Sequence, residues 1–160
     1  MNESSGDFRD SSGVLVRPPI AWALAVVAGL ALEWLYPFGF LPAAMPVGWL
    51  GSLVFIAGLA LLIWAASTFR KSGTNVRTSQ PTTTVVIKGP YQYSRNPIYV
   101  SMFLGLIGLA VAFDSLWLII VLLPFYLVIR YGVVAREEAY LERKFGDSYR
   151  AYKSRIGRWL

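Results

Sequence analysis

The sequence predicts an all-α membrane protein, a bundle of four transmembrane helices with both termini on the cytoplasmic side and amphipathic C-terminal helices. Of the 160 residues, 56% are apolar, and the mean hydropathy is +0.51. This is too apolar for an ordinary soluble domain of this size. The apolar residues also fall into four runs, each near the length of about 20 helical residues that a bilayer core requires.

The chain is predicted to consist of a disordered tail over residues 1–16, rich in Ser, Asp and Gly, and a single membrane domain over residues 17–160. Pro18 and Pro19 suit the start of the first helix, because their missing N–H groups cost nothing there. The predicted spans cover residues 20–36, 47–69, 97–113 and 116–134.

The first apolar run is interpreted as a span and not as a signal peptide. It is long for a signal-peptide core, and it ends in Glu33-Trp34-Leu35-Tyr36, where a cleavage site would have small residues. Glu33 lies near the predicted outer end of this span. It either reaches water at the interface or serves as a structural partner within the bundle.

The distribution of charge predicts the orientation of the bundle. The chain has 15 Lys and Arg residues against 9 Asp and Glu, a net charge of +6. No Lys or Arg lies in the predicted outer connections, residues 37–46 and a tight hairpin at Asp114-Ser115. The positive-inside rule therefore places both termini and the 70–96 loop in the cytoplasm. The same rule explains the positive charge, so no nucleic-acid partner is expected.

Residues 135–157 are predicted to form cytoplasmic helices. Apolar side chains recur there at helical spacing, at Leu141, Phe145, Tyr149, Tyr152 and Ile156. Gly146 is expected to end one helix and Asp147 to cap the next. Two interpretations stay open: an interfacial helix on anionic lipid, or a lid over the inner mouth of the bundle.

The residue inventory restricts the chemistry. The chain has no cysteine and no histidine, which excludes disulfides, thiolate nucleophiles, imidazole bases and His/Cys metal sites. No metal is expected. A reaction that depends on a reactive cofactor and on positioning suits the remaining groups.

The segment before the third span is polar, aromatic and bracketed by prolines. Gly89-Pro90 predicts a turn. Asn96 lies close to the N-cap of the third span, where free N–H groups favour an anion, and Arg95 adds a forked cation. The predicted guest is a carboxylate or phosphate. The alternative is an ordinary helix cap with an arginine that reaches the lipid headgroups, and the tyrosines of this segment are equally common at a membrane interface.

The inner end of the fourth span carries ionisable residues. Arg130 lies within apolar sequence, and such residues usually face the bundle interior. Glu137 follows seven residues later and is expected to share that face. The positive-inside rule does not explain the acids Glu137 and Glu138 at a basic surface. The alternative is pairing with Lys and Arg along the helix surface.

Four motifs follow one another in order: Gly89-Pro90-Tyr91, then Arg95-Asn96-Pro97-Ile98-Tyr99, then Glu137-Glu138 after a helical hairpin, then Phe145-Gly146-Asp147-Ser148-Tyr149-Arg150-Ala151-Tyr152. This order resembles the integral-membrane methyltransferases related to isoprenylcysteine carboxyl methyltransferase and phospholipid N-methyltransferases. The resemblance covers about residues 70–160.

The resemblance implies an S-adenosylmethionine cofactor on the cytoplasmic side and a lipophilic acceptor that enters from the bilayer. The acceptor is an isoprenylcysteine-like carboxylate or a lipid amine or thiol. Arg130 is the catalytic candidate, expected to face the acceptor. The implied cofactor-binding residues are Thr83, Thr84, Val85, Val86, Gly89, Tyr91, Arg95, Asn96, Pro97, Ile98, Tyr99 and Glu137.

The chain departs from the family pattern at two positions. The family usually has histidine at the position of Asn96, and asparagine keeps the hydrogen bonding but cannot carry charge. Carboxyl-methylating members have arginine at the position of Val133, which argues against a carboxylate acceptor. Two other functions stay open: a nicotinamide-dependent membrane reductase, and a non-enzymatic assembly protein that binds a partner through the C-terminal aromatic stripe.

Overall fold

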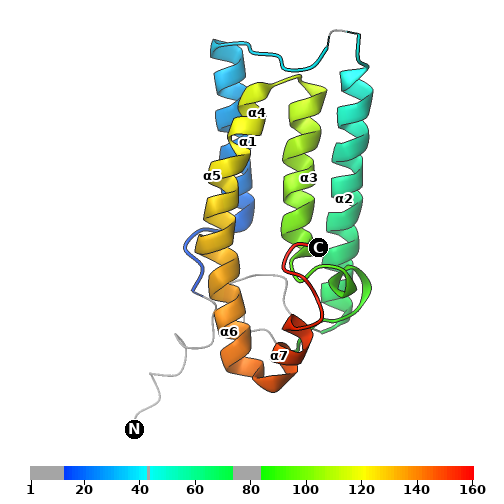
Figure 1. Ribbon diagram of the computed structural model, residues 1–160, viewed down its shortest axis with the longest axis vertical. Helices are drawn as coiled ribbons and strands as arrows, with labels where there is room; N and C mark the ends of the chain where they lie inside the picture. The colour runs from blue at the N-terminus through cyan, green and yellow to red at the C-terminus, as the bar shows by residue number, and fades with distance from the viewer. Residues whose placement is uncertain (1–12, 43, 74–83) are drawn as a thin grey trace.

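Figure 1 shows the computed structural model, which describes residues 13–42, 44–73 and 84–160. Every regular element in these residues is helical. In chain order the elements are α1 (Pro18–Leu35), α2 (Val47–Lys71), the 3-10 helix η1 (Gly89–Gln92), α3 (Pro97–Ala112), α4 (Leu116–Ile120), α5 (Leu122–Leu127), the π-helix η2 (Val128–Val134), α6 (Ala135–Phe145) and α7 (Asp147–Lys153). The all-α class is confirmed, and most of the tail predicted to be disordered lies outside the described residues.

Three helical stretches are long and apolar enough to cross a bilayer: α1, α2 and the run Leu116–Phe145, which joins α4 to α6. The fourth predicted span is α3, an apolar helix of 16 residues. At 1.5 Å per residue it measures about 24 Å, shorter than a bilayer core. The number of spans and the cytoplasmic position of the termini therefore remain predictions.

Apolar side chains cover the outside of the bundle as well as its centre. Leu24 and Val27 of α1 and Leu53 and Ile63 of α2 are more than 60% exposed. By contrast, α3 is the central helix in Figure 1 and contributes fully buried side chains such as Leu106. An apolar exterior of this extent is typical of a helix bundle that is covered by lipid.

Glycines allow α2 and α3 to pack with their backbones close together. A Cβ atom at Gly108 would lie 2.5 Å from the backbone nitrogen of Phe55, and a Cβ atom at Gly51 would overlap the backbone of Ala112. Helices in lipid gain little from hydrophobic association, so close contact through small residues is a principal source of their stability.

The predicted hairpin between α3 and α4 is confirmed and is tied to the α1–α2 connection at the top of Figure 1. The Oδ1 atom of Asp114 accepts hydrogen bonds from the backbone N–H groups of Phe40 at 2.9 Å and Leu41 at 2.8 Å. Glu33 accepts another from Phe38 at 3.1 Å, in keeping with the structural role considered for it. These carboxylates satisfy backbone donors of the connection.

The long helix Leu116–Phe145 changes its hydrogen-bonding pattern twice. Pro124 has no N–H group, and the helix is interrupted at Val121, where α4 gives way to α5. The stretch Val128–Val134 is then a π-helix, which packs more residues into each turn. A spacing of seven residues across it no longer brings two side chains to the same face.

The C-terminal residues follow the predicted break. Gly146 ends α6 with a φ of 51°, a conformation that favours glycine. The prediction that Asp147 caps the next helix is wrong: Asp147 is the first residue of α7, makes no cap, and pairs with Arg150 at 2.7 Å.

The α2–α3 contact predicts a sharp difference between two glycines of α2. Gly51→Ala should destabilise the protein by about 1–3 kcal/mol, because the added methyl group has no space against α3. Gly48→Ala is the matched control, since nothing lies within 4 Å of a Cβ atom there. Thermal unfolding in detergent micelles measures both. Equal melting temperatures for the two variants would contradict the close packing.

Candidate active site

A cavity of about 970 Å³ lies between α1, α2 and α3 and continues to α6 and α7. Its two ends differ in chemistry. One end is lined by apolar side chains of the bundle, which include Ile20, Trp22, Phe55, Leu59, Leu62 and Met102. The other end is lined by polar and aromatic side chains, which include Tyr91, Asn96, Tyr99, Glu137, Tyr149 and Tyr152. The shape fits a guest with a polar group and an apolar chain.

The loop before α3 is held against α2 by a buried tyrosine. Tyr91 is 5% exposed, and its ring centroid lies 5.5 Å from that of Phe69. Tyr152 of α7 donates a hydrogen bond to the backbone oxygen of Tyr91 at 2.8 Å. The hydroxyl of Tyr91 itself is buried and has no hydrogen-bond partner among the described residues. A buried hydroxyl in this state suits a ligand that supplies the missing partner.

Glu137 reaches the cavity from the start of α6. Both of its carboxylate oxygens lie 2.9 Å from the hydroxyl oxygen of Tyr99, which donates to them. The acids that line the cavity, among the described residues, are Glu137 and Glu138. Glu137 makes no ion pair there. Its carboxylate oxygens therefore have further lone pairs that could accept hydrogen bonds from a cationic guest.

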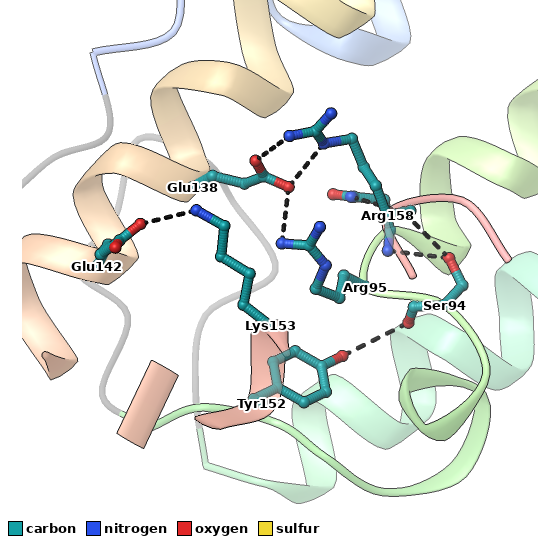
Figure 2. A network of polar contacts seen from close by, with 8 residues as sticks. Ser94, Arg95, Glu138, Glu142, Tyr152, Lys153 and Arg158 are labelled. Atoms are coloured by element: carbon teal, nitrogen blue, oxygen red, sulfur yellow. Dashed lines mark hydrogen bonds and ion pairs between the residues drawn. The ribbon is translucent and has the colours of Figure 1, made fainter. Parts of the chain in front are cut away.

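Glu138 is occupied by two arginines, as Figure 2 shows. Arg95 Nη1 lies 3.0 Å from Glu138 Oε1, and both side chains are less than 10% exposed. Arg158 approaches the same carboxylate with Nε at 2.9 Å and Nη2 at 2.7 Å. This fork geometry gives strong, directional pairing. Arg95, predicted to bind the cofactor, already has its charge neutralised by Glu138.

Asn96 is the N-cap residue of α3, as predicted, but its side chain does not cap the helix. Its Nδ2 atom donates a hydrogen bond to the backbone oxygen of Arg158 at 3.0 Å. The side-chain amide is therefore committed to the residues that follow α7. This contact could not be predicted from local sequence patterns, because the two residues are 62 positions apart.

Burial raises the pKa values of the tyrosines around the polar end of the cavity. Burial raises the pKa of Tyr149 to about 12, and the nearby Glu138 carboxylate adds to this shift. Burial also raises the pKa of Tyr91 and of Tyr152 well above their ordinary value. These phenols stay protonated at any physiological pH and can serve as hydrogen-bond donors.

Ten of the predicted site residues line this one cavity, and two of the described ones, Gly89 and Arg130, do not. Thr83 lies outside the described residues. Gly89, with a φ of 58°, lines a smaller neighbouring hollow beside Thr68. Arg130 does not line the cavity, and its guanidinium lies 5.2 Å from the ring centroid of Tyr131. The residues brought together are Thr84, Val85, Val86, Tyr91, Arg95, Asn96, Pro97, Ile98, Tyr99 and Glu137.

The expectation that Arg130 and Glu137 share a face is wrong. Glu137 lines the cavity and Arg130 does not, because the π-helix between them changes the rotation per residue. Sequence reasoning also missed Arg17 and Trp22 at the start of α1, which line the cavity. The indole nitrogen of Trp22 donates to the backbone oxygen of Met102 at 2.9 Å, a contact between distant segments.

Comparison with known proteins adds an independent finding. A family model described as phospholipid methyltransferase matches residues 46–148. A protein of Haemophilus influenzae, described as uncharacterized, is 54% identical over 44 residues, which are 28% of this chain and 67% of that protein. No solved structure matches the chain.

The structure predicts unequal effects for two acids of α6. Glu138→Ala should destabilise the protein by about 3–5 kcal/mol, because it leaves buried Arg95 without its counter-charge. Glu142→Ala removes a half-exposed pair with Lys153 and should cost about 0–1 kcal/mol. Both pairs appear in Figure 2. Denaturant unfolding of the purified variants gives the comparison, and a Glu138 variant as stable as the Glu142 variant would refute the assignment.

Proposed function

Because the chain belongs to the phospholipid methyltransferase family, whose model matches residues 46–148, we propose that it transfers a methyl group from S-adenosylmethionine to a lipophilic acceptor. The observation that carries the proposal is the two-ended cavity. At its polar end lie a carboxylate and a buried hydroxyl that have no cation and no hydrogen-bond partner, respectively, among the described residues, and an apolar space continues from them into the bundle.

The polar end fits the cofactor in charge and in hydrogen bonding. When bound, S-adenosylmethionine supplies a methyl group on a sulfonium, whose departure leaves a neutral thioether. Glu137 provides the negative charge that a sulfonium or ammonium requires. The Tyr91 hydroxyl provides a donor, and the backbone of residues 84–86 provides further polar groups along the same wall. In this proposal Thr84, Val85, Val86, Tyr91, Asn96, Pro97, Ile98, Tyr99 and Glu137 hold the cofactor.

The apolar end would hold the acceptor. Phe55, Leu59 and Leu62 of α2 face Trp22 of α1 across the cavity lining and offer an apolar surface for a lipid chain. Tyr149 and Tyr152 close the cytoplasmic side and reduce access of water. Positioning of this kind accounts for much of the rate of an in-line displacement, for which no side-chain nucleophile is needed.

The charges favour an amine acceptor over a carboxylate. Val133, at the position where carboxyl-methylating relatives carry arginine, is fully buried in the apolar core. Among the described residues the cavity is lined by two arginines, Arg17 and Arg95, and Arg95 is paired with Glu138. A carboxylate would therefore lie near Glu137 with little compensation. Arg130 remains a predicted acceptor contact that this arrangement does not require.

The small number of arginines that line the cavity also argues against a nicotinamide-dependent reductase. The phosphates of NADPH require several free cations, and Arg17 is the one lining arginine in the described chain that makes no ion pair. The alternative of a non-enzymatic assembly protein does not explain the presence of the cavity. Thermal shifts with S-adenosylhomocysteine and with NADPH separate the first alternative from methyl transfer.

The direct test is transfer of label. Purified protein in nanodiscs, incubated with methyl-labelled S-adenosylmethionine and total membrane lipid, should move the label into a lipid with a nitrogen headgroup. S-adenosylhomocysteine should suppress the transfer. Label in a lipid carboxylate would contradict the amine assignment. No transfer to any lipid, together with stabilisation by NADPH but not by S-adenosylhomocysteine, would contradict the proposed function.

Substitution of Glu137 tests the cofactor site. Glu137→Gln should weaken binding of S-adenosylhomocysteine about tenfold or more, because hydrogen bonds to a charged group contribute about 1.5–3 kcal/mol. Glu142→Gln is the matched control on the same helix, since Glu142 does not line the cavity. Isothermal titration calorimetry measures both, and an unchanged dissociation constant for the Glu137 variant would remove this residue from the site.

A further inference from the structure

The residues that follow α7 form a strap, defined here as residues 154–160, which crosses the start of α3. The family match ends at residue 148, so the strap lies outside the matched region. Its backbone accepts hydrogen bonds from the loop before α3. Arg95 N donates to Gly157 O at 3.0 Å, and Asn96 Nδ2 donates to Arg158 O at 3.0 Å. The strap thus holds two loop residues that line the cavity.

The strap is itself anchored at its far end. The ring centroid of Trp159 lies 5.7 Å from that of Phe103 and 5.8 Å from that of Tyr126. Phe103 in turn packs edge-on against the buried Phe125 at 5.1 Å. Aromatic contacts at these distances favour one arrangement, so the carbonyl groups of the strap are presented to the loop from a fixed position.

The Arg158 side chain adds a charge to this arrangement. The guanidinium groups of Arg158 and Arg95 both pair with the carboxylate of Glu138 (Figure 2). Two acids, Glu137 and Glu138, are adjacent in sequence, and they compete for nearby cations. Arg158 and Arg95 both pair with Glu138, and Glu137 has no ion pair among the described residues. Removal of Arg158 allows Arg95 to be shared between the two acids.

We propose that Arg158 is a positioning residue for the cofactor site, which acts through Glu138 and the loop of Arg95 and Asn96 without lining the cavity itself. This inference rests on the proposed function, since the ligand whose affinity it sets is the methyl donor. Arg158 links three segments that are far apart in the chain: the loop before α3, the start of α6 and the strap.

The test compares two arginines of the strap. Arg158→Gln should weaken the affinity for S-adenosylhomocysteine about tenfold, a coupling within the usual range between linked sites. Arg155→Gln is the matched control, because Arg155 is exposed and its side chain bonds, within the described part of the chain, only the backbone oxygen of Ala151. Arg158→Lys keeps the charge without the fork and should lose affinity by an intermediate factor. If Arg158→Gln does not fold, the comparison is made with Arg158→Lys.

Calorimetry is performed on folded protein in nanodiscs, well below the melting temperature of each variant. A weaker affinity for Arg158→Gln alone, with an intermediate value for Arg158→Lys, supports the positioning role. A lower melting temperature with unchanged affinity would assign Arg158 a purely structural role and overturn the inference. If the unaltered protein does not bind S-adenosylhomocysteine, the proposed function fails and the inference fails with it, an outcome distinct from normal binding by an Arg158 variant.

Discussion

The ion pairs of the Glu138 carboxylate are the interactions on which the end of the bundle formed by α6, α7 and the start of α3 depends. This carboxylate accepts Arg95 from the loop before α3 and Arg158 from the strap, and it belongs to α6. Three segments that are far apart in the sequence therefore meet at one buried carboxylate. The desolvation of such a group is costly unless every charge has its partner, so the geometry of the loop, of α6 and of the strap is fixed together.

Glu137 and Glu138 both line the cavity, but they have different partners. Glu137 and Glu138 are neighbours, yet one is held by two guanidinium groups and the other by the hydroxyl of Tyr99. The difference follows from helix geometry, because adjacent residues of a helix point in directions about 100° apart. With two adjacent acids, Glu138 can hold the arginines of the fold while Glu137 stays available for the ligand of the proposed function.

The local features could be predicted from the sequence, because each depends on the backbone preference of a single residue. Pro18 starts α1, Gly146 ends α6, and Asp114 turns the hairpin, each through the backbone chemistry of its own residue. The π-helix and the contacts of the strap could not be predicted in this way. A π-helix depends on how neighbouring segments pack, and the contact of Asn96 with Arg158 joins residues 62 positions apart. Tyr152 was seen as part of an apolar stripe, so its hydrogen bond to Tyr91 was missed.

The acids Glu137 and Glu138 lie at the end of the bundle that the positive-inside rule predicts to be cytoplasmic, where that rule favours basic residues. The positive-inside rule arises from membrane insertion and applies to exposed loops in general. Acidic residues in such a loop are therefore expected to have nearby cations that compensate their charge. Glu138 has such cations in two arginines, and its contribution is structural. Glu137 has no ion pair among the described residues, although it lies at the boundary between the apolar bundle and the tyrosine-rich end of the cavity. An uncompensated carboxylate at such a boundary is costly for stability alone, and a cationic guest removes the cost. Under the proposed function, this carboxylate would link the stability of the folded protein to the affinity for the methyl donor.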